Sequence, residues 1–291
     1  MLGFPLNDVV SGFRWKAGLT FCLLLGWFSV LQADTSREWK VLAPGMELRQ
    51  LVAKLPGSVG DSRITVLRID PSLWQLEFVG VASPGEKSSH TAREWSASHN
   101  FTAAINAGMF DADGRTHLGY LRYRGEVNNG KSNSYQSVAA FDPSDPKHSP
   151  GFRIFDLDDH STALPGILKN YNSAVQNLRL IKRPGVNQWT RQSRKWSEAA
   201  LGEDNSGRIL FIFCRSPFSM HDLNRELLSS GIGLVAAQHL EGGPEAQLYV
   251  NAGGVQLEMF GSYETAFRED DGNSIPWPVP NILGVRPRTS K

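Results

Sequence analysis

Short apolar runs of strand length recur along this chain, and they constrain its fold more than any other feature. Several are rich in β-branched and aromatic residues and are bounded by Gly, Pro, Asp or Asn, which is typical of β-strands. Two segments, 91–99 and 219–229, have the caps and spacing of helices. The sequence therefore predicts an α+β fold, a single domain of mixed, largely antiparallel β-sheets flanked by a few helices. The predicted strands are Ile64–Ile69, Trp74–Val81, Phe101–Ile105, Ser137–Phe141, Phe152–Phe155, Arg208–Cys214, Leu234–Leu240, Gln247–Val250 and Ile282–Val285.

The first 33 residues have the features of an export signal. Arg14 and Lys16 form a basic region, the stretch 17–31 is apolar and uncharged, and Ala33 offers a small residue for cleavage. The apolar stretch is shorter than the ~20 residues that a membrane-spanning helix needs. We expect cleavage, no stable membrane span afterwards, and a periplasmic or secreted protein; an uncleaved anchor is the alternative. The predicted organisation is a signal peptide over 1–33, a lead-in segment over 34–62 and one domain over 63–288.

The charge balance argues against a nucleic-acid-binding protein, and the cysteine content argues against a disulfide-stabilised one. Without residues 1–33 the chain has 28 basic and 28 acidic residues, so it lacks the basic field of a nucleic-acid binder. Cys214 is then the only cysteine, which leaves no intrachain disulfide and makes the fold depend on its core. Because Cys214 lies in an apolar run, we expect a buried core residue rather than a nucleophile.

Two glycine-bearing segments follow predicted strands and carry polar residues suited to chemistry. The first is 106–111, Asn-Ala-Gly-Met-Phe-Asp, and the second is 239–245, His-Leu-Glu-Gly-Gly-Pro-Glu. Polar groups at the end of a buried strand lie at the rim of a sheet, and glycines let the backbone turn sharply or approach a ligand. Two such strand ends in one domain predict a shared cleft.

In the second segment, His239 and Glu241 are two residues apart. Alternation along an extended strand points both side chains the same way. An imidazole and a carboxylate before Gly242 and Gly243 suit an acid–base pair. The alternative is structural, with Glu241 capping the following turn and His239 half-buried and satisfied.

In the first segment, Asn106 either donates to a substrate oxygen or forms an Asx turn that holds Gly108. Asp111 and Asp113 resemble part of a calcium loop, but the later ligand positions do not follow. The sequence therefore predicts no metal site and no cofactor, and it leaves assistance by a divalent cation open.

Two arginines between these segments are candidate phosphate ligands. Arg179 and Arg194 each present a planar fork of donors that matches phosphate oxygens. A serine hydrolase is disfavoured, because no Gly-x-Ser-x-Gly elbow occurs and Ser219 already serves as a helix cap.

The order of these motifs resembles the phosphodiester glycosidase family, in particular a bacterial branch with an Asn-Ala-Gly-Met-Phe motif. Each motif is short, but the ordered set spans roughly residues 64–285. Glu241 stands where the family has Asp, which moves the carboxylate by about 1 Å, and Arg179 stands where it has Pro. The matching segments are Asn106–Phe110, Gln176–Ile181, Arg194, Ala200–Gly202, Leu240–Gly243 and Val279–Val285.

The resemblance implies that the domain over 63–288 is a hydrolase that cleaves a sugar-1-phosphate phosphodiester in an envelope or extracellular glycan. Asp111 or Glu245 would supply a second carboxylate. The alternative function is a non-catalytic envelope protein that binds a phosphorylated or acidic glycan. The candidate catalytic residues are Glu241, Asn106 and His239, and the candidate substrate-binding residues are Arg194, Gly108, Gly242, Gly243 and Asp111.

Overall fold

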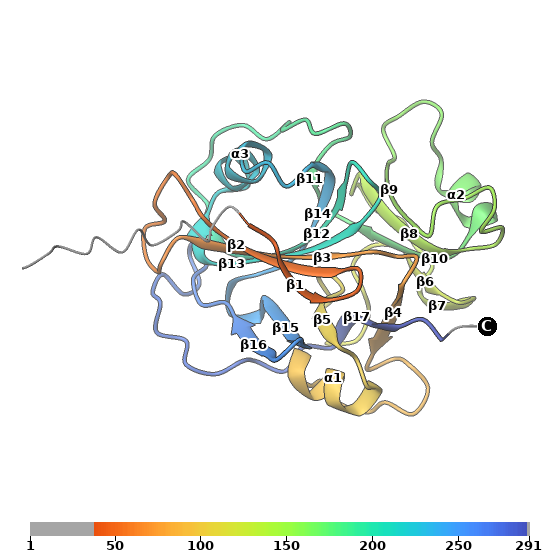
Figure 1. Ribbon diagram of the computed structural model, residues 1–291, viewed down its shortest axis with the longest axis horizontal. Helices are drawn as coiled ribbons and strands as arrows, with labels where there is room; N and C mark the ends of the chain where they lie inside the picture. The colour runs from red at the N-terminus through yellow and green to blue at the C-terminus, as the bar shows by residue number, and fades with distance from the viewer. Residues whose placement is uncertain (1–37, 290–291) are drawn as a thin grey trace, which may run out of the picture. The chain divides into compact units, whose positions relative to one another are not determined.

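Three β-sheets make up most of the protein (Figure 1). The structure is a computed structural model that describes residues 38–289; the predicted signal peptide lies outside the described residues. Every pairing between the named strands of this part is antiparallel. The described residues fall within one compact unit. The predicted single-domain α+β fold of largely antiparallel sheets is confirmed.

The seven-stranded sheet carries the second glycine-bearing segment at the end of β14. Its first two strands, β1 and β2, fall in the predicted lead-in segment 34–62 and extend the sheet from β3. In order across the sheet, the strands are β1 (Lys40–Ala43), β2 (Met46–Val52), β3 (Arg63–Ile69), β13 (Ile209–Phe218), β12 (Trp196–Asp204), β14 (Leu234–Gly242) and β11 (Arg179–Ile181).

The other two sheets have five strands each, and one of them carries the first glycine-bearing segment after β5. That sheet has the order β16 (Val255–Phe260), β15 (Gln247–Ala252), β5 (Ala103–Asn106), β17 (Asn281–Pro287) and β4 (Trp74–Gly80). The remaining sheet has the order β7 (Glu126–Asn129), β6 (Leu121–Tyr123), β10 (Tyr171–Asn177), β8 (Ser137–Pro143) and β9 (Phe152–Asp156).

The two predicted helices form where their caps indicate. Helix α1 (Ala92–His99) begins after Thr91, which forms a capping box with Glu94. Helix α3 (Met220–Ser229) begins after Ser219, whose hydroxyl accepts from the backbone N–H of Asp222. Helix α2 (Leu164–Asn170) was not predicted, and its N-cap, an alanine, makes no side-chain hydrogen bond.

One apolar cluster joins the inner faces of the three sheets. Leu67, Phe141 and Leu248, one from each sheet, belong to it. Each helix packs against one sheet: α3 against β11 and β13, α2 against β8 and β10, and α1 against β5, β15 and β17 (Figure 1). Cys214 is free and fully buried, as predicted. The strand ends that carry the candidate residues therefore rest on a shared rigid core.

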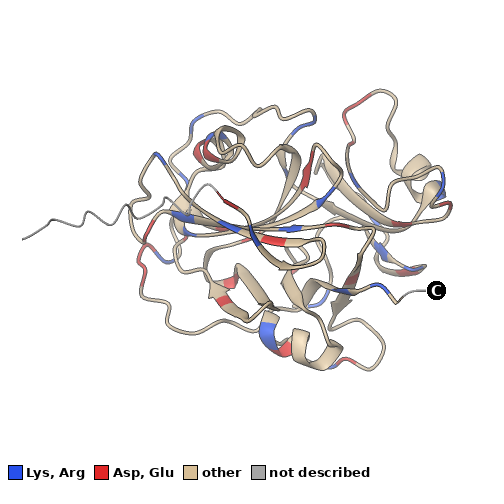
Figure 2. Cartoon of the chain, viewed as in Figure 1, with Lys and Arg blue, Asp and Glu red and all other residues tan. Residues whose placement is uncertain are grey.

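Charged residues of both signs are interspersed along the ribbon (Figure 2). The described part of the chain contains no helix that is long and apolar enough to cross a membrane.

Candidate active site

Asn106 connects the two glycine-bearing segments. Strand β5 pairs with β15, with Ile105 opposite Leu248, so the end of β5 lies beside the start of β15. Asn106 Nδ2 donates to the carbonyl of Glu245 at 2.9 Å, and its Oδ1 accepts from the N–H of Gln247 at 2.6 Å. The side chain is almost fully buried. Asn106 thus holds the short helical turn η2 (Gly243–Glu245) instead of forming the expected Asx turn.

Glu241, at the end of β14, is a buried carboxyl group with a strongly shifted pKa. Burial and the nearby charge of Glu245 raise its pKa to about 8, and Glu264 adds to this. The charge of His239 and the N–H of Gly242, which Oε1 accepts at 3.1 Å, act in the opposite direction. Glu241 therefore makes the local bond expected of a turn cap and also has the perturbed pKa typical of functional carboxyl groups.

The second carboxyl group beside Glu241 is Glu245. It lies on η2, and burial raises its pKa, with a further contribution from the charge of Glu264. Asp111, the other expected candidate, lies in an exposed turn, where its Oδ1 accepts from the N–H of Ala112 at 2.7 Å. Of the two, the structure brings Glu245 to Glu241.

His239 bonds a residue that sequence reasoning missed. Its Nδ1 lies 2.6 Å from Glu198 Oε1, and Trp196 Nε1 donates to the other oxygen of Glu198 at 2.6 Å. Burial alone would lower the pKa of His239, but the charge and hydrogen bond of Glu198 outweigh it, and the pKa is raised. The carboxylate of Glu198 therefore favours the protonated form of the imidazole.

The register between β12 and β14 explains why His239 does not bond Glu241 directly. Ala200 pairs with His239 whereas Ala199 pairs with Glu241, so β14 has one extra residue at this step. Such a bulge breaks the alternation on which the expected shared face depends. His239 and Glu241 still interact through their charges.

The glycines of both segments allow close approach of other groups. Gly243 has a φ of +61°, and a Cβ there would come within 2.7 Å of Glu264 Oε2. Gly108 has a φ of +152°, and a Cβ there would come within 2.2 Å of Asn177 Oδ1. Side chains at these positions would strain the backbone and displace neighbouring polar groups. Gly242 leads into η2 next to Trp196.

Strand β10 supports the site from the other side. Asn177 Nδ2 donates to the carbonyl of Ala107 at 2.9 Å and to Gln238 Oε1 at 3.1 Å. Gln176 Nε2 donates to the carbonyl of Tyr135 at 2.7 Å. Burial and the charge of Glu241 raise the pKa of Tyr135, which places its hydroxyl group near that carboxyl group.

The two candidate arginines differ in their surroundings. Arg179 Nη1 lies 2.6 Å from Asp158 Oδ1 and 3.3 Å from Asp156 Oδ1, so its charge is already neutralised. Arg194 is exposed and has no hydrogen bond or ion pair with any residue that the structure describes. The next residue, Lys195, donates its N–H to Thr265 Oγ1 at 2.9 Å, beside Glu264. Of the two candidates, Arg194 therefore has the guanidinium that is available to an anion.

Three residues from outside the two motifs are placed at the site only by the fold. Glu264 and Tyr135 lie near Glu241, and Glu198 lies beside His239. Glu198 is the third residue of β12 (Trp196–Asp204), whose hydrophobic pattern gives no signal for it. Within residues 38–289, no group of three or more His, Cys, Asp or Glu side chains has the arrangement of a metal site.

The chain belongs to the phosphodiester glycosidase family, because the sequence model of that family matches residues 99–286. Its fold is similar to that of the catalytic domain of zebrafish N-acetylglucosamine-1-phosphodiester α-N-acetylglucosaminidase, in a structure auto-inhibited by the pro-peptide. The TM-score is 0.60 at 14% sequence identity, and the match covers 86% of this chain and 88% of that chain. A hypothetical protein from Synechocystis gives a TM-score of 0.54 at 14% identity, with 84% of this chain and 63% of that chain covered. No curated protein matches by sequence.

Proposed function

We propose that this protein is an exported hydrolase that cleaves a sugar-1-phosphate phosphodiester in an envelope or extracellular glycan. Family membership supports a hydrolase that acts on sugars linked through a phosphodiester. The proposal rests mainly on Glu241. This carboxyl group is buried beside Glu245, and its pKa is raised to about 8. A raised pKa makes the ionised carboxylate a stronger base.

In the proposed reaction, ionised Glu241 takes a proton from a water molecule that attacks the anomeric carbon. The new bond joins that carbon to the water oxygen, and the bond to the phosphate oxygen breaks with its electron pair. The products are the free sugar and a phosphomonoester. Because a phosphate is a good leaving group, no strong general acid is needed. Glu245, which lies beside Glu241, would stabilise positive charge on the sugar ring.

His239 and Arg194 supply the positive charge that this reaction needs. The carboxyl groups alone would repel a phosphodiester. Protonated His239, held by Glu198, favours ionisation of Glu241. Arg194 would contact the phosphate oxygens.

Asn106 holds the turn that presents the backbone of Gly242 and Gly243. Gly108 allows close packing at the other strand end, and Asp111 stays a candidate contact at the exposed rim.

The proposal is tested by the release of reducing sugar from methyl N-acetylglucosamine-1-phosphate and from teichoic-type phosphodiesters. This first sugar is chosen from the name of the zebrafish enzyme. We expect Glu241→Gln to lower the turnover number by roughly 10²- to 10⁴-fold, the usual contribution of a general base. Glu126→Gln, the same change on exposed strand β7, should leave turnover unchanged. Full turnover by Glu241→Gln would contradict the assignment.

A non-catalytic glycan-binding protein is the second candidate, and the replacement of the family Asp by Glu241 favours it. That protein would bind a phosphorylated or acidic glycan without turnover, and Glu241→Gln would leave the affinity unchanged. Calorimetric titration with the same phosphodiesters distinguishes the two functions.

Export is the remaining part of the proposal and rests on the predicted signal over 1–33. Mass spectrometry of the protein from the periplasm or the culture medium should show a chain that begins at Asp34. A chain that still begins at Met1 would contradict cleavage.

A further inference from the structure

The connection between β16 and β17 carries apolar side chains that the core does not bury. Phe267 is 64% exposed, and Trp277 is half-buried. Their ring centroids lie 6.2 Å apart at an angle of 85°, an edge-to-face contact. Two neighbouring aromatic rings that remain in contact with solvent form a preorganised apolar surface.

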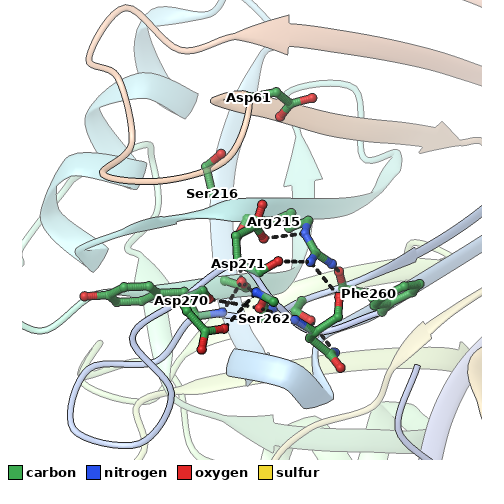
Figure 3. A network of polar contacts seen from close by, with 12 residues as sticks. Asp61, Arg215, Ser216, Phe260, Ser262, Asp270 and Asp271 are labelled. Atoms are coloured by element: carbon green, nitrogen blue, oxygen red, sulfur yellow. Dashed lines mark hydrogen bonds and ion pairs between the residues drawn. The ribbon is translucent and has the colours of Figure 1, made fainter. Parts of the chain in front are cut away.

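Arg215, on β13, fixes this connection to the seven-stranded sheet (Figure 3). Its Nε donates to Asp271 Oδ1 at 2.6 Å, and its Nη1 donates to the carbonyl of Phe260 at 2.8 Å. Its Nη2 donates to the carbonyls of Asp271 and Asn273 at 3.0 and 2.8 Å. One guanidinium thus binds both arms of the loop.

Ser262 closes the same loop from within (Figure 3). Its hydroxyl group donates to the carbonyl of Asp270 at 2.9 Å and accepts from the N–H of Asn273 at 3.1 Å. Its own N–H donates to Ser197 Oγ, on β12, at 3.0 Å. These bonds tie the loop between residues 262 and 273 together and to β12.

Both rings lie close in sequence to residues that contact the candidate active site. The N–H of Phe267 donates to the carbonyl of Glu264 at 3.1 Å, and Glu264 packs against Gly243 and raises the pKa of Glu241. The carbonyl of Trp277 accepts from Gln247 Nε2, and the N–H of Gln247 donates to Asn106. The aromatic pair is therefore anchored on both sides of η2.

We infer that Phe267 and Trp277 form a subsite for a second sugar ring of the glycan, next to the sugar whose bond is cleaved. The inference rests on the proposed function. Aromatic rings remove the apolar C–H face of a pyranose from water while the hydroxyl groups stay solvated. The rings carry no charge, so they bind sugar without competing for the phosphate. The subsite makes a glycan of at least two rings the preferred substrate.

The test compares one-ring and two-ring substrates in matched variants. The one-ring substrate is methyl N-acetylglucosamine-1-phosphate. The two-ring substrates are methyl chitobiose-1-phosphate and N-acetylglucosamine-1-phospho-6-mannose, which extend the chain on opposite sides of the cleaved bond. We expect Phe267→Ala to raise KM about tenfold for at least one two-ring substrate, with kcat unchanged and both constants unchanged for the one-ring substrate.

Ile275→Ala is the matched control, because Ile275 is also 64% exposed on the same loop and lies outside the ring pair. It should leave KM unchanged for all three substrates. Equal KM values for Phe267→Ala and the natural chain on both two-ring substrates would overturn the subsite. So would an equal rise in KM for the one-ring substrate, because the rings would then contact the reacting sugar.

A binding measurement separates failure of the subsite from failure of the proposed function. If no substrate is turned over, calorimetric titration with chitotriose, which has no phosphate, tests the rings alone. Binding by the natural chain and by Ile275→Ala, with about tenfold weaker binding by Phe267→Ala, would support the subsite without the hydrolase. Absence of binding by the natural chain in that experiment would overturn the subsite.

Discussion

The side-chain amide of Asn106 donates to the carbonyl of Glu245 at 2.9 Å, and these residues are 139 positions apart in the sequence. Through this bond and the one from the N–H of Gln247, one buried amide joins the end of β5 to the turn that follows β14. The two glycine-bearing segments therefore form one site because Asn106 fills both roles, donor and acceptor, between them.

Loss of this amide should destabilise the fold as well as the site. Asn106→Ala leaves the carbonyl of Glu245 and the N–H of Gln247 without their side-chain partner in a buried place, which costs roughly 1–3 kcal/mol. Urea unfolding measures this cost as a lower midpoint at constant slope. An Asn106→Ala protein with natural stability but no activity would show that Asn106 acts on the substrate and does not position η2.

The raised pKa of Glu241 makes stability depend on pH in a defined direction. In the folded state this carboxyl group holds its proton up to a pH of about 8, whereas its ordinary pKa is 4.5. Its contribution to stability is complete below pH 4.5 and is lost as the pH rises towards 8. Glu241→Gln removes this loss, so its stability relative to the natural chain should rise by roughly 2–4 kcal/mol across that range. Unfolding curves of both proteins at pH 5 and pH 8 measure this change. If the difference in stability between Glu241→Gln and the natural chain were the same at both pH values, the raised pKa of Glu241 would be contradicted.

Glu198 should control the charge of His239. The bond between His239 Nδ1 and Glu198, at 2.6 Å, raises the pKa of the imidazole against the effect of burial. In Glu198→Gln the carboxylate charge is gone, so burial dominates and the pKa should fall below its ordinary value near 6.5. Titration of the histidine ring carbons by NMR follows this directly. A pKa of His239 that stays raised in Glu198→Gln would show that another group holds the proton.

Gly243 offers a test of the contact with Glu264. Gly243→Ala places a Cβ within 2.7 Å of Glu264 Oε2 at a φ of +61°. Gly254→Ala imposes a similar backbone, φ +73°, with no atom within 4 Å of the Cβ. Both should lose about 1 kcal/mol of stability from backbone strain, but only Gly243→Ala should also lose activity. Equal activity in the two variants would remove Glu264 from the site.

The sequence was sufficient for the strands and helices whose patterns are strong. Each of the nine predicted runs contains a strand, although β5 begins at Ala103 and not at Phe101, and Thr91 and Ser219 cap the two predicted helices. Strands β10 and β12 were not found from their hydrophobic pattern, because they bury polar residues such as Gln176 and Glu198. Their partners lie on other strands, so a hydrophobic pattern read along one strand does not reveal them.

The candidate site was predictable in its two motifs but not in its connections. Glycine and polar residues at strand ends pointed to Asn106 and Glu241, and in the structure Glu245 lies next to both. The bulge before Glu241 could not be predicted from the sequence, because a regular strand is expected to point successive side chains to opposite faces. Glu198 and Glu264 are brought in by tertiary pairing alone.

The dependence of kcat/KM on pH for methyl N-acetylglucosamine-1-phosphate tests the central claim most directly. Because Glu241 must be ionised to act as a base, kcat/KM should rise with pH up to an apparent pKa of about 8, and the residual activity of Glu241→Gln should lack this rise. A rate that is flat or falls across this range in the natural chain would contradict the role assigned to Glu241.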